Sequence, residues 1–166
     1  MEALTTLFLH HIPEACFFAL AGLGLVGFKT AARQWFPFVL AFGIVVHVAR
    51  LQFFPWHVPV LAALQAVAQR YYFRISWVTS IGAVFVSLIL LNLGEAMIAL
   101  AVFPILSLSA QQVLHDPGLY VAIGWGTQIP LVVATLGVYR WGWVILPLHG
   151  DGGGAGVERS ATGEKR

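Results

Sequence analysis

Charged residues are scarce in this chain. Asp, Glu, Lys and Arg make up only 10% of its 166 residues, whereas 59% are hydrophobic. Soluble domains carry about 25% charged residues, so the composition excludes an ordinary soluble protein and is typical of an integral membrane protein. The length suits one small helical bundle. We therefore expect a single all-α transmembrane domain over residues 1–148, followed by a disordered polar cytoplasmic tail over residues 149–166.

Cysteine is nearly absent as well. Cys16 stands alone, which excludes a disulfide within the chain and a cluster of thiolate metal ligands. No base accompanies Cys16 in the sequence, and no Ser-His-Asp arrangement is present. Gly152–Gly154 precedes a polar tail, whereas a phosphate-binding loop precedes a helix. These absences favour a non-enzymatic protein without a cofactor.

The histidines do not have the spacing of a metal site. His10, His11 and Glu14 are close in sequence, but Pro13 is expected to break their helical spacing. No two histidines stand four residues apart, the spacing that places a ligand pair on one helix face. We therefore expect no bound metal.

The amino terminus lacks the marks of a cleaved leader. It carries Glu2, it has no Lys or Arg before the first apolar run, and no clear small-residue cleavage site follows. No lipidation motif is visible either. We expect this segment to be retained.

Long apolar runs dominate what is present. About 20 apolar residues at 1.5 Å each cross the hydrocarbon core of a bilayer, and the longest run holds a single carboxylate, Glu95. The third run is short, so the alternative to a third membrane-spanning helix is a re-entrant segment. The pattern predicts five membrane-spanning helices, at Ile12–Phe28, Trp35–Phe54, Val58–Phe73, Ile75–Ser107 and Leu119–Val138.

Prolines and polar residues predict how these helices begin, bend and end. Met1–His11 is expected to form a short arm before Pro13, which suits the first turn of a helix. Pro104 predicts a break in the fourth helix, and Pro130 predicts a kink in the fifth. Between these two helices, Ser109 and Gln112 form a capping-box pattern. That pattern predicts a short interfacial helix before the last span.

Basic residues predict the orientation of the chain. Cytoplasmic loops of membrane proteins carry an excess of Lys and Arg. If the amino terminus lies outside, eight of the nine basic residues fall on the cytoplasmic side and only Arg50 does not. The prediction is N-out and C-in, with these residues inside: Lys29, Arg33, Arg70, Arg74, Arg140, Arg159, Lys165 and Arg166.

Polar residues within the expected spans gather in the outer half of the membrane. Arg50 lies about 22 Å along its helix from the inner side, and Glu95 about 30 Å. Their expected companions are Glu14 and His47, with His57 in the adjacent turn. One reading is a structural network in which Arg50 lies between two carboxylates. The others are an outward-facing pocket for a ligand, peptide or ion, and a proton-relay or transport site.

A second set of polar residues fits helix packing. Gln65 and Gln69 share one face of the third span, and hydrogen bonds to neighbouring helices are their expected role, with a pore lining as the alternative. Ser87 and Asn92 belong to a broad polar sector of the fourth span. We expect these two to pack against other helices as well.

Four segments resemble the N-terminal membrane region of Firmicutes sensor histidine kinases of the GHKL type. They read HHIPEACFFALAGLGLVG, VARLQFFPWHVPVL, SLILLNLGEAM and DPGLYVAIGWGTQIPLVV, and the resemblance covers roughly residues 9–143. Such a region senses a signal and dimerises in the bacterial plasma membrane. Because this chain has no phosphorylatable His helix and no ATP-binding domain, the resemblance implies a stand-alone sensing module without kinase activity.

Three functions follow from these observations. The first is a sensory or regulatory module that binds a signal through Glu14, Arg50, Glu95 and His57, and acts as a homodimer or through a separate membrane or cytoplasmic partner. The second is a small transporter or channel, or the substrate-binding subunit of a transporter. The third is a structural scaffold subunit of a membrane complex. Nucleic acid is not an expected partner, because the basic residues fall at membrane boundaries.

Overall fold

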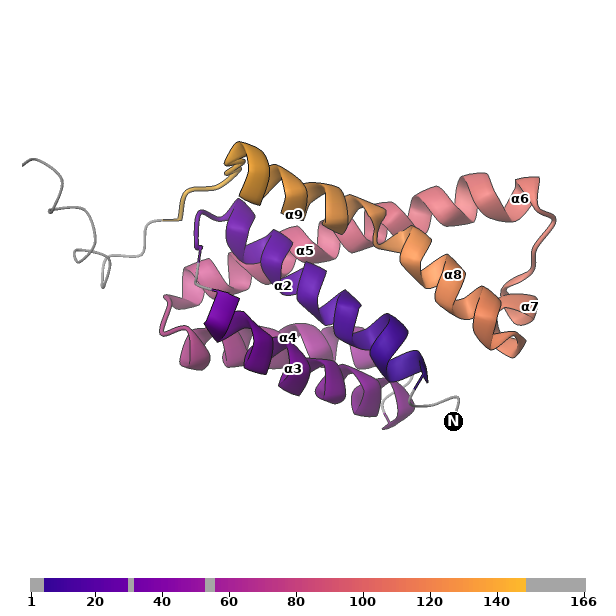
Figure 1. Ribbon diagram of the computed structural model, residues 1–166, viewed down its shortest axis with the longest axis horizontal. Helices are drawn as coiled ribbons and strands as arrows, with labels where there is room; N and C mark the ends of the chain where they lie inside the picture. Colours follow the sequence, from indigo (N-terminus) through magenta and orange to yellow (C-terminus); the bar gives the residue numbers. More distant parts are fainter. Residues whose placement is uncertain (1–4, 30–31, 53–55, 149–166) are drawn as a thin grey trace, which may run out of the picture.

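The computed structural model of the chain describes residues 5–29, 32–52 and 56–148. All regular structure in these residues is helical, as the apolar periodicity predicts, and the ribbon forms an elongated bundle (Figure 1). In chain order the helices are η1 (Leu7–His11), α2 (Ile12–Leu25), α3 (Ala32–Gln52), α4 (His57–Tyr72), α5 (Trp77–Met97), η2 (Ile98–Val102), α6 (Phe103–Ile105), α7 (Ala110–His115), α8 (Pro117–Thr127) and α9 (Ile129–Trp141).

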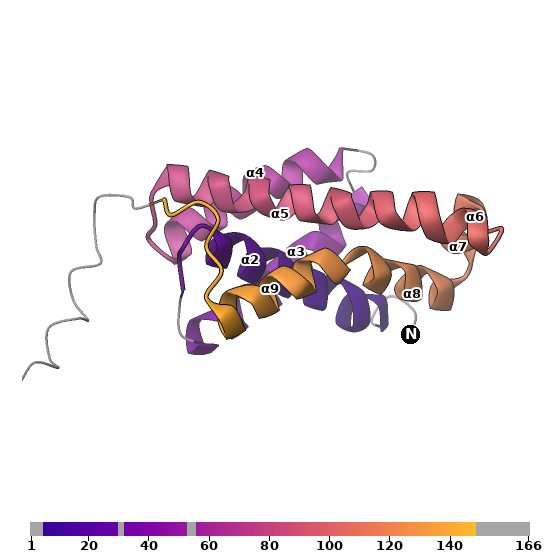
Figure 2. The ribbon, with the colours of Figure 1, turned by 90° about the horizontal axis from the view of Figure 1, so that it is seen from above.

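Helix α2 is the centre of the bundle. It packs against α3, α5 and α9, and α4 covers α3 and α5 (Figures 1 and 2). The α2–α3 connection, the α4–α5 connection and the end of α9 lie at one end of the bundle. We call this the basic end, because it carries Lys29, Arg33, Arg70, Arg74 and Arg140. The start of η1, the end of α3 and the start of α8 lie at the opposite end.

Two wide helical turns allow prolines to sit inside long helices. Proline has no N–H and its ring clashes with the carbonyl four residues earlier, and a π-helical turn relieves that crowding. The π turn η1 ends two residues before Pro13, and η2 ends two residues before Pro104. The helices therefore run on as Leu7–Leu25 and Trp77–Ile105.

These turns bear on two expectations about where helices begin and end. The expected arm over Met1–His11 is wrong for residues 5–11, which are helical and continue into α2. The break expected near Pro104 is confirmed, since the fourth helix includes Pro104 and ends at Ile105. The π turn before each proline removes the clash that a regular helix would have had.

The last apolar run is bent, as Pro130 predicts. Helices α8 and α9 meet at Gln128 with an angle of 43° between them. The bend lies two residues before the proline, because Pro130 has no N–H to continue the hydrogen-bond ladder of α8.

The expected capping box of Ser109 and Gln112 is present at the start of α7. Asp116 caps α8 by accepting from the Gly118 and Leu119 amides at 2.9 and 3.1 Å.

Two helices, Leu7–Leu25 and Trp77–Ile105, are long and apolar enough to cross a membrane. The bent pair α8 and α9 makes a third if it is counted as one span. Helix α4 has 16 residues, about 24 Å at 1.5 Å per residue, and neither α3 nor α4 is among these candidates. A membrane location is thus supported, and the five-span topology with its orientation stays a prediction.

Two expected features lie outside the described residues, the end of the second span and the polar tail. The second expected span was to end at Phe54, before Pro55, and residues 53–55 are not described. The expected disordered tail, residues 149–166, is not described either. The last described residues close the basic end, where the Ile145 amide donates to the Leu25 carbonyl at 2.8 Å.

Helices α2 and α5 approach each other most closely at a glycine. A Cβ on Gly22 would overlap the Ala83 carbonyl and the Ser87 hydroxyl. Ser87 Oγ donates to the Phe18 carbonyl at 2.6 Å across this crossing, the packing role expected of it. Small residues of this kind let two backbones meet in a lipid environment.

Replacement of Gly22 by Ala is expected to lower the free energy of unfolding by about 1–3 kcal/mol, because the new methyl group meets backbone that cannot move aside. The measurement is an SDS titration of the purified protein in mixed micelles. Gly126→Ala is the control, since its Cβ meets only the far end of the Ile98 side chain, at 2.8 Å. Equal stability of the two variants would show that the crossing is not tightly packed.

Candidate functional site

A group of polar side chains meets at the end of the bundle opposite the basic end. We call it the polar cluster; it comprises two residues of η1, one of α2, two of α3, one of α8 and one at the α8–α9 bend. Most of these side chains are buried, although the surrounding helices are apolar. Its members are His10, His11, Glu14, His47, Arg50, Tyr120 and Gln128.

An ion pair between Glu14 and Arg50 is the core of the polar cluster. Arg50 Nη2 donates to Glu14 Oε1 at 2.5 Å, and the two side chains are 25% and 8% exposed. Arg50 Nη1 donates to the Tyr120 hydroxyl at 3.1 Å. A buried carboxylate is costly unless it is paired and hydrogen-bonded, so this contact holds α2 against α3 and draws α8 onto them.

His10 connects the ion pair to the bend between α8 and α9. Its Nε2 lies 3.8 Å from Glu14 Oε2 and 3.5 Å from Arg50 Nη1. Gln128 Nε2 lies 3.2 Å from His10 Nδ1. Because Gln128 Nε2 and Arg50 Nη1 can only donate, one of the two ring nitrogens accepts and the imidazole is neutral. The expectation that Pro13 separates His10 from Glu14 is wrong, because the π turn keeps the helix continuous and places them on one face.

A pair of imidazoles ties η1 to α3. His11 Nδ1 and His47 Nδ1 are 2.9 Å apart, and one of the two nitrogens donates to the other. His11 is 4% exposed, and its Nε2 has no hydrogen-bond partner. Together with the Glu14–Arg50 contact, this pair fixes the rotation of α3 about its own axis.

Glu95 belongs to the same region but not to the ion pair. It is exposed on α5, and no hydrogen bond or ion pair joins it to another described residue. The expected network placed Arg50 between the carboxylates of Glu14 and Glu95. The contact with Glu14 is present, and the contact with Glu95 is not. Both terminal nitrogens of Arg50 are already engaged, one by Glu14 and one by the Tyr120 phenol.

Two cavities adjoin the ion pair on different sides. The first, which we call the carboxylate groove, has a volume of about 270 Å³ and lies between α2, α5 and α8. Its polar lining consists of His10, Glu14, Arg50, Glu95, Tyr120 and Thr127, and its apolar lining includes Leu91, Phe103, Val113 and Ile123.

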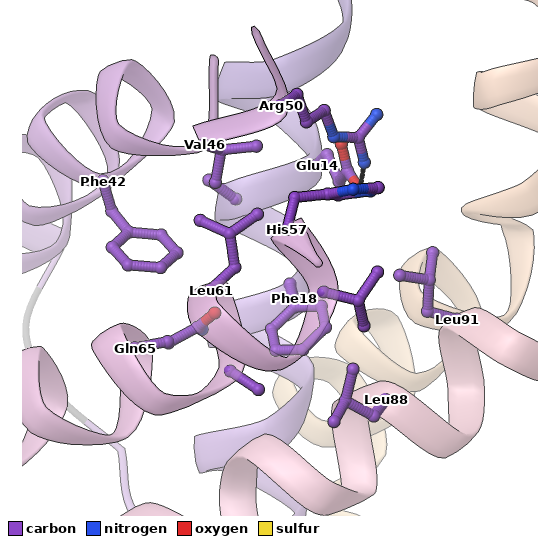
Figure 3. A pocket seen from close by; sticks show the side chains of 13 residues that line it. Glu14, Phe18, Phe42, Val46, Arg50, His57, Leu61, Gln65, Leu88 and Leu91 are labelled. Carbon is purple, nitrogen blue, oxygen red and sulfur yellow. Dashed lines mark hydrogen bonds and ion pairs between the residues drawn. The ribbon is translucent and has the colours of Figure 1, made fainter. Parts of the chain in front are cut away.

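The second cavity, the glutamine pocket, lies between α2, α3, α4 and α5 and measures about 50 Å³, enough for a few waters. Glu14, Arg50 and His57 close one end of it and Gln65 lines another side, with Phe18, Val46 and Leu88 among the walls (Figure 3). The carboxylate groove and the glutamine pocket share Glu14, Arg50 and Leu91. The ion pair is therefore the wall between them.

His57 lies at the first residue of α4, outside the expected spans, and close to the ion pair in the glutamine pocket (Figure 3).

The glutamines of α4 do not behave as expected. Both side chains are buried, at 3% and 1% exposed, but Gln65 Nε2 and Gln69 Oε1 have no hydrogen-bond partner. In the part of the chain that the structure describes, no hydrogen bond joins these two atoms to a neighbouring helix. A polar contact between α4 and α5 is made instead by Ser80, whose Oγ donates to the Ala66 carbonyl at 2.5 Å.

Asn92 is a further correction. It was expected to pack between helices, but it is exposed, and its Nδ2 donates to the Leu88 carbonyl of its own helix at 2.7 Å. A local bond of this kind satisfies the amide without any neighbouring helix.

Two members of the polar cluster were not found from the sequence. Tyr120 and Gln128 carry no charge and stand in an apolar run, so nothing marked them as partners of Arg50 and His10. For Gln128 one signal was available, because it is a polar residue beside the proline of an expected kink.

These features define the class of the protein: an all-helical protein with two or three helices able to cross a membrane, and with a buried ion pair beside two cavities. Among the described residues, no group of three or more His, Cys, Asp or Glu is arranged to hold a metal ion. No protein-family model, curated protein or solved structure matches the chain.

Removal of Arg50 is expected to destabilise the protein more than removal of both charges. Arg50→Gln leaves the Glu14 carboxylate buried without a counter-charge, at a cost of about 3 kcal/mol. The double variant Glu14→Gln/Arg50→Gln should cost less than Arg50→Gln alone, as measured by SDS titration. Arg33→Gln, which removes an exposed arginine from the basic end, serves as the control. A double variant that loses the sum of the two single effects would show that the pair is not coupled.

Proposed function

We propose that this chain is a non-enzymatic sensory or regulatory module of a bacterial plasma membrane, which binds a small ligand in the carboxylate groove. The observation that carries the proposal is the position of the Glu14–Arg50 pair, which is buried and lines the groove. Charged residues at membrane depth are costly and commonly mark sites of function. The resemblance to the membrane region of sensor kinases supports the same role.

The fold offers a route from the groove to the basic end. Gln128 lies at the bend between α8 and α9 and donates to His10, which adjoins the ion pair. A ligand between α5 and α8 would alter this bend, and α9 runs from it to the basic end (Figure 1). A homodimer contact or a separate partner protein at that end would receive the change.

The same proposal includes five spans with the amino terminus outside. In this arrangement α3 and α4 cross the membrane beside α2, and each sequential helix reverses direction, which agrees with the ribbon (Figure 2). Support comes from the five basic residues at the end opposite the polar cluster, since cytoplasmic ends of membrane proteins are rich in Lys and Arg. The polar cluster would then lie in the outer half of the bilayer.

The orientation is testable with two matched cysteine variants in a Cys16→Ser background. Gln111 on α7 and Gln34 on α3 are both exposed, and they lie at opposite ends of the bundle. In intact spheroplasts we expect Gln111→Cys to react with a membrane-impermeant maleimide, and Gln34→Cys to react only after permeabilisation. The reverse pattern would show that the amino terminus lies inside.

Partner coupling is testable by photo-crosslinking in native membranes. p-Benzoylphenylalanine in place of Tyr71, which is 70% exposed near the basic end, is expected to capture a second copy or a specific protein. Glu95→Gln should change the yield of that product at least threefold, because it alters the groove without removing a structural contact. Asp116→Asn is the control, since it removes a carboxylate but keeps a good N-cap.

A product whose yield is the same in Glu95→Gln would refute coupling between the groove and the partner. The absence of any specific product would refute the sensory role itself.

A small transporter, channel or substrate-binding subunit is the second candidate. The glutamine pocket on the other side of the ion pair favours it, because a substrate that passed Glu14 and Arg50 would enter that pocket. Solute flux into liposomes without a captured partner would favour this candidate.

A further inference from the structure

We infer that the ligand of the carboxylate groove is a small organic cation, with an ammonium group held between Glu14 and Glu95. This inference rests on the proposed ligand-binding role and adds the chemical class of the ligand. It follows from the charge of the lining, the free acceptor atoms and the shape of the groove.

The lining has one carboxylate in excess. Glu14 and Glu95 are its two acidic residues and Arg50 is its one strongly basic residue. His10 adds no positive charge, because Gln128 Nε2 and Arg50 Nη1, which can only donate, face its two ring nitrogens. An anionic ligand would therefore meet a net negative surface, whereas a monocation would neutralise it.

Three of the lining residues, Glu14, Glu95 and Thr127, carry acceptor oxygens that no donor in the described part of the chain occupies. Glu14 is only 6% exposed, and while its Oε1 binds Arg50, its Oε2 has no hydrogen-bond partner. Glu95 has no bonded partner among the described residues. The Thr127 hydroxyl donates to the Gly124 carbonyl at 2.8 Å, so its oxygen can still accept. An ammonium group has three N–H donors, one for each of these three side chains.

The apolar residues that line the groove suit the hydrocarbon part of an organic amine. Leu91, Phe103, Val113 and Ile123 line the groove and offer apolar contact. The volume of about 270 Å³ is too large for a bare metal ion, and the described residues contain no metal-ligand group. A compact alkyl or arylalkyl amine fits both the polar and the apolar parts of the groove.

The test uses the purified full chain in zwitterionic nanodiscs, with empty nanodiscs as the blank. Three probes of similar shape are titrated by isothermal calorimetry: phenethylamine, neutral 2-phenylethanol and anionic 3-phenylpropionate. We expect the amine to bind at least tenfold more tightly than either analogue. Sodium and potassium chloride, titrated as competitors at matched ionic strength, distinguish an organic cation from an inorganic one.

Two variants locate the site. Glu95→Gln is expected to weaken amine binding at least tenfold, and because Glu95 is exposed and unbonded, its unfolding transition should not change. Asp116→Asn removes a carboxylate that does not line the groove, and the affinity should stay within twofold.

Equal affinity for the amine and the alcohol, tighter binding of the carboxylate, or full binding by Glu95→Gln would each overturn the inference. So would complete displacement of the amine by sodium or potassium at millimolar concentration, which would assign the site to an inorganic cation. None of these results bears on partner capture by photo-crosslinking. Failure of the ligand class is thereby distinguished from failure of the sensory role.

Discussion

The buried contact between Glu14 and Arg50 constrains the rest of this structure. A carboxylate and a guanidinium buried inside an apolar bundle are expected to form an ion pair, because either group left unpaired would carry a large desolvation cost. Their contact sets the height and rotation of α3 against α2. Tyr120 accepts from Arg50 Nη1, and Gln128 at the α8–α9 bend contacts His10 beside the pair, so α8 and the bend lie against it. One ion pair thus positions three stretches that are distant in sequence: η1 with α2, α3, and α8 with the bend that follows it.

The backbone reaches this arrangement through its prolines. A regular helix interrupted at Pro13 would have separated His10 and His11 from Glu14. The π turn η1 keeps them on one continuous helix, and the equivalent turn η2 extends the long helix past Glu95 to the far wall of the carboxylate groove. At Pro130 the chain instead bends, and Gln128 is freed there to meet His10. Irregular helical turns are often found at functional sites, and here they shape the groove.

The ion pair also separates two cavities of different character. The carboxylate groove is larger and has an excess acidic residue, whereas the glutamine pocket is small and ends in an unpartnered amide. Any ligand that contacts Glu14 alters the electrostatic balance of Arg50, and thereby the hold of α3 and α8 on α2. A structural network and the proposed binding site are therefore compatible in this protein, because Glu14 and Arg50 hold the helices together and also line the groove.

The sequence by itself determined the all-helical class with runs apolar enough to cross a membrane, the capping box of α7, the kink near Pro130 and the proximity in height of Glu14 and Arg50. These properties are local, or follow from counting 1.5 Å per residue along an axis. Only the tertiary structure decided which side chains meet. Arg50 hydrogen-bonds to Tyr120 and not, as had been expected, to Glu95. The Asn92 amide hydrogen-bonds to the backbone of its own helix, and Gln128 hydrogen-bonds to His10. Those choices depend on the rotation of each helix about its axis and on its turns, and hydropathy carries no information about either.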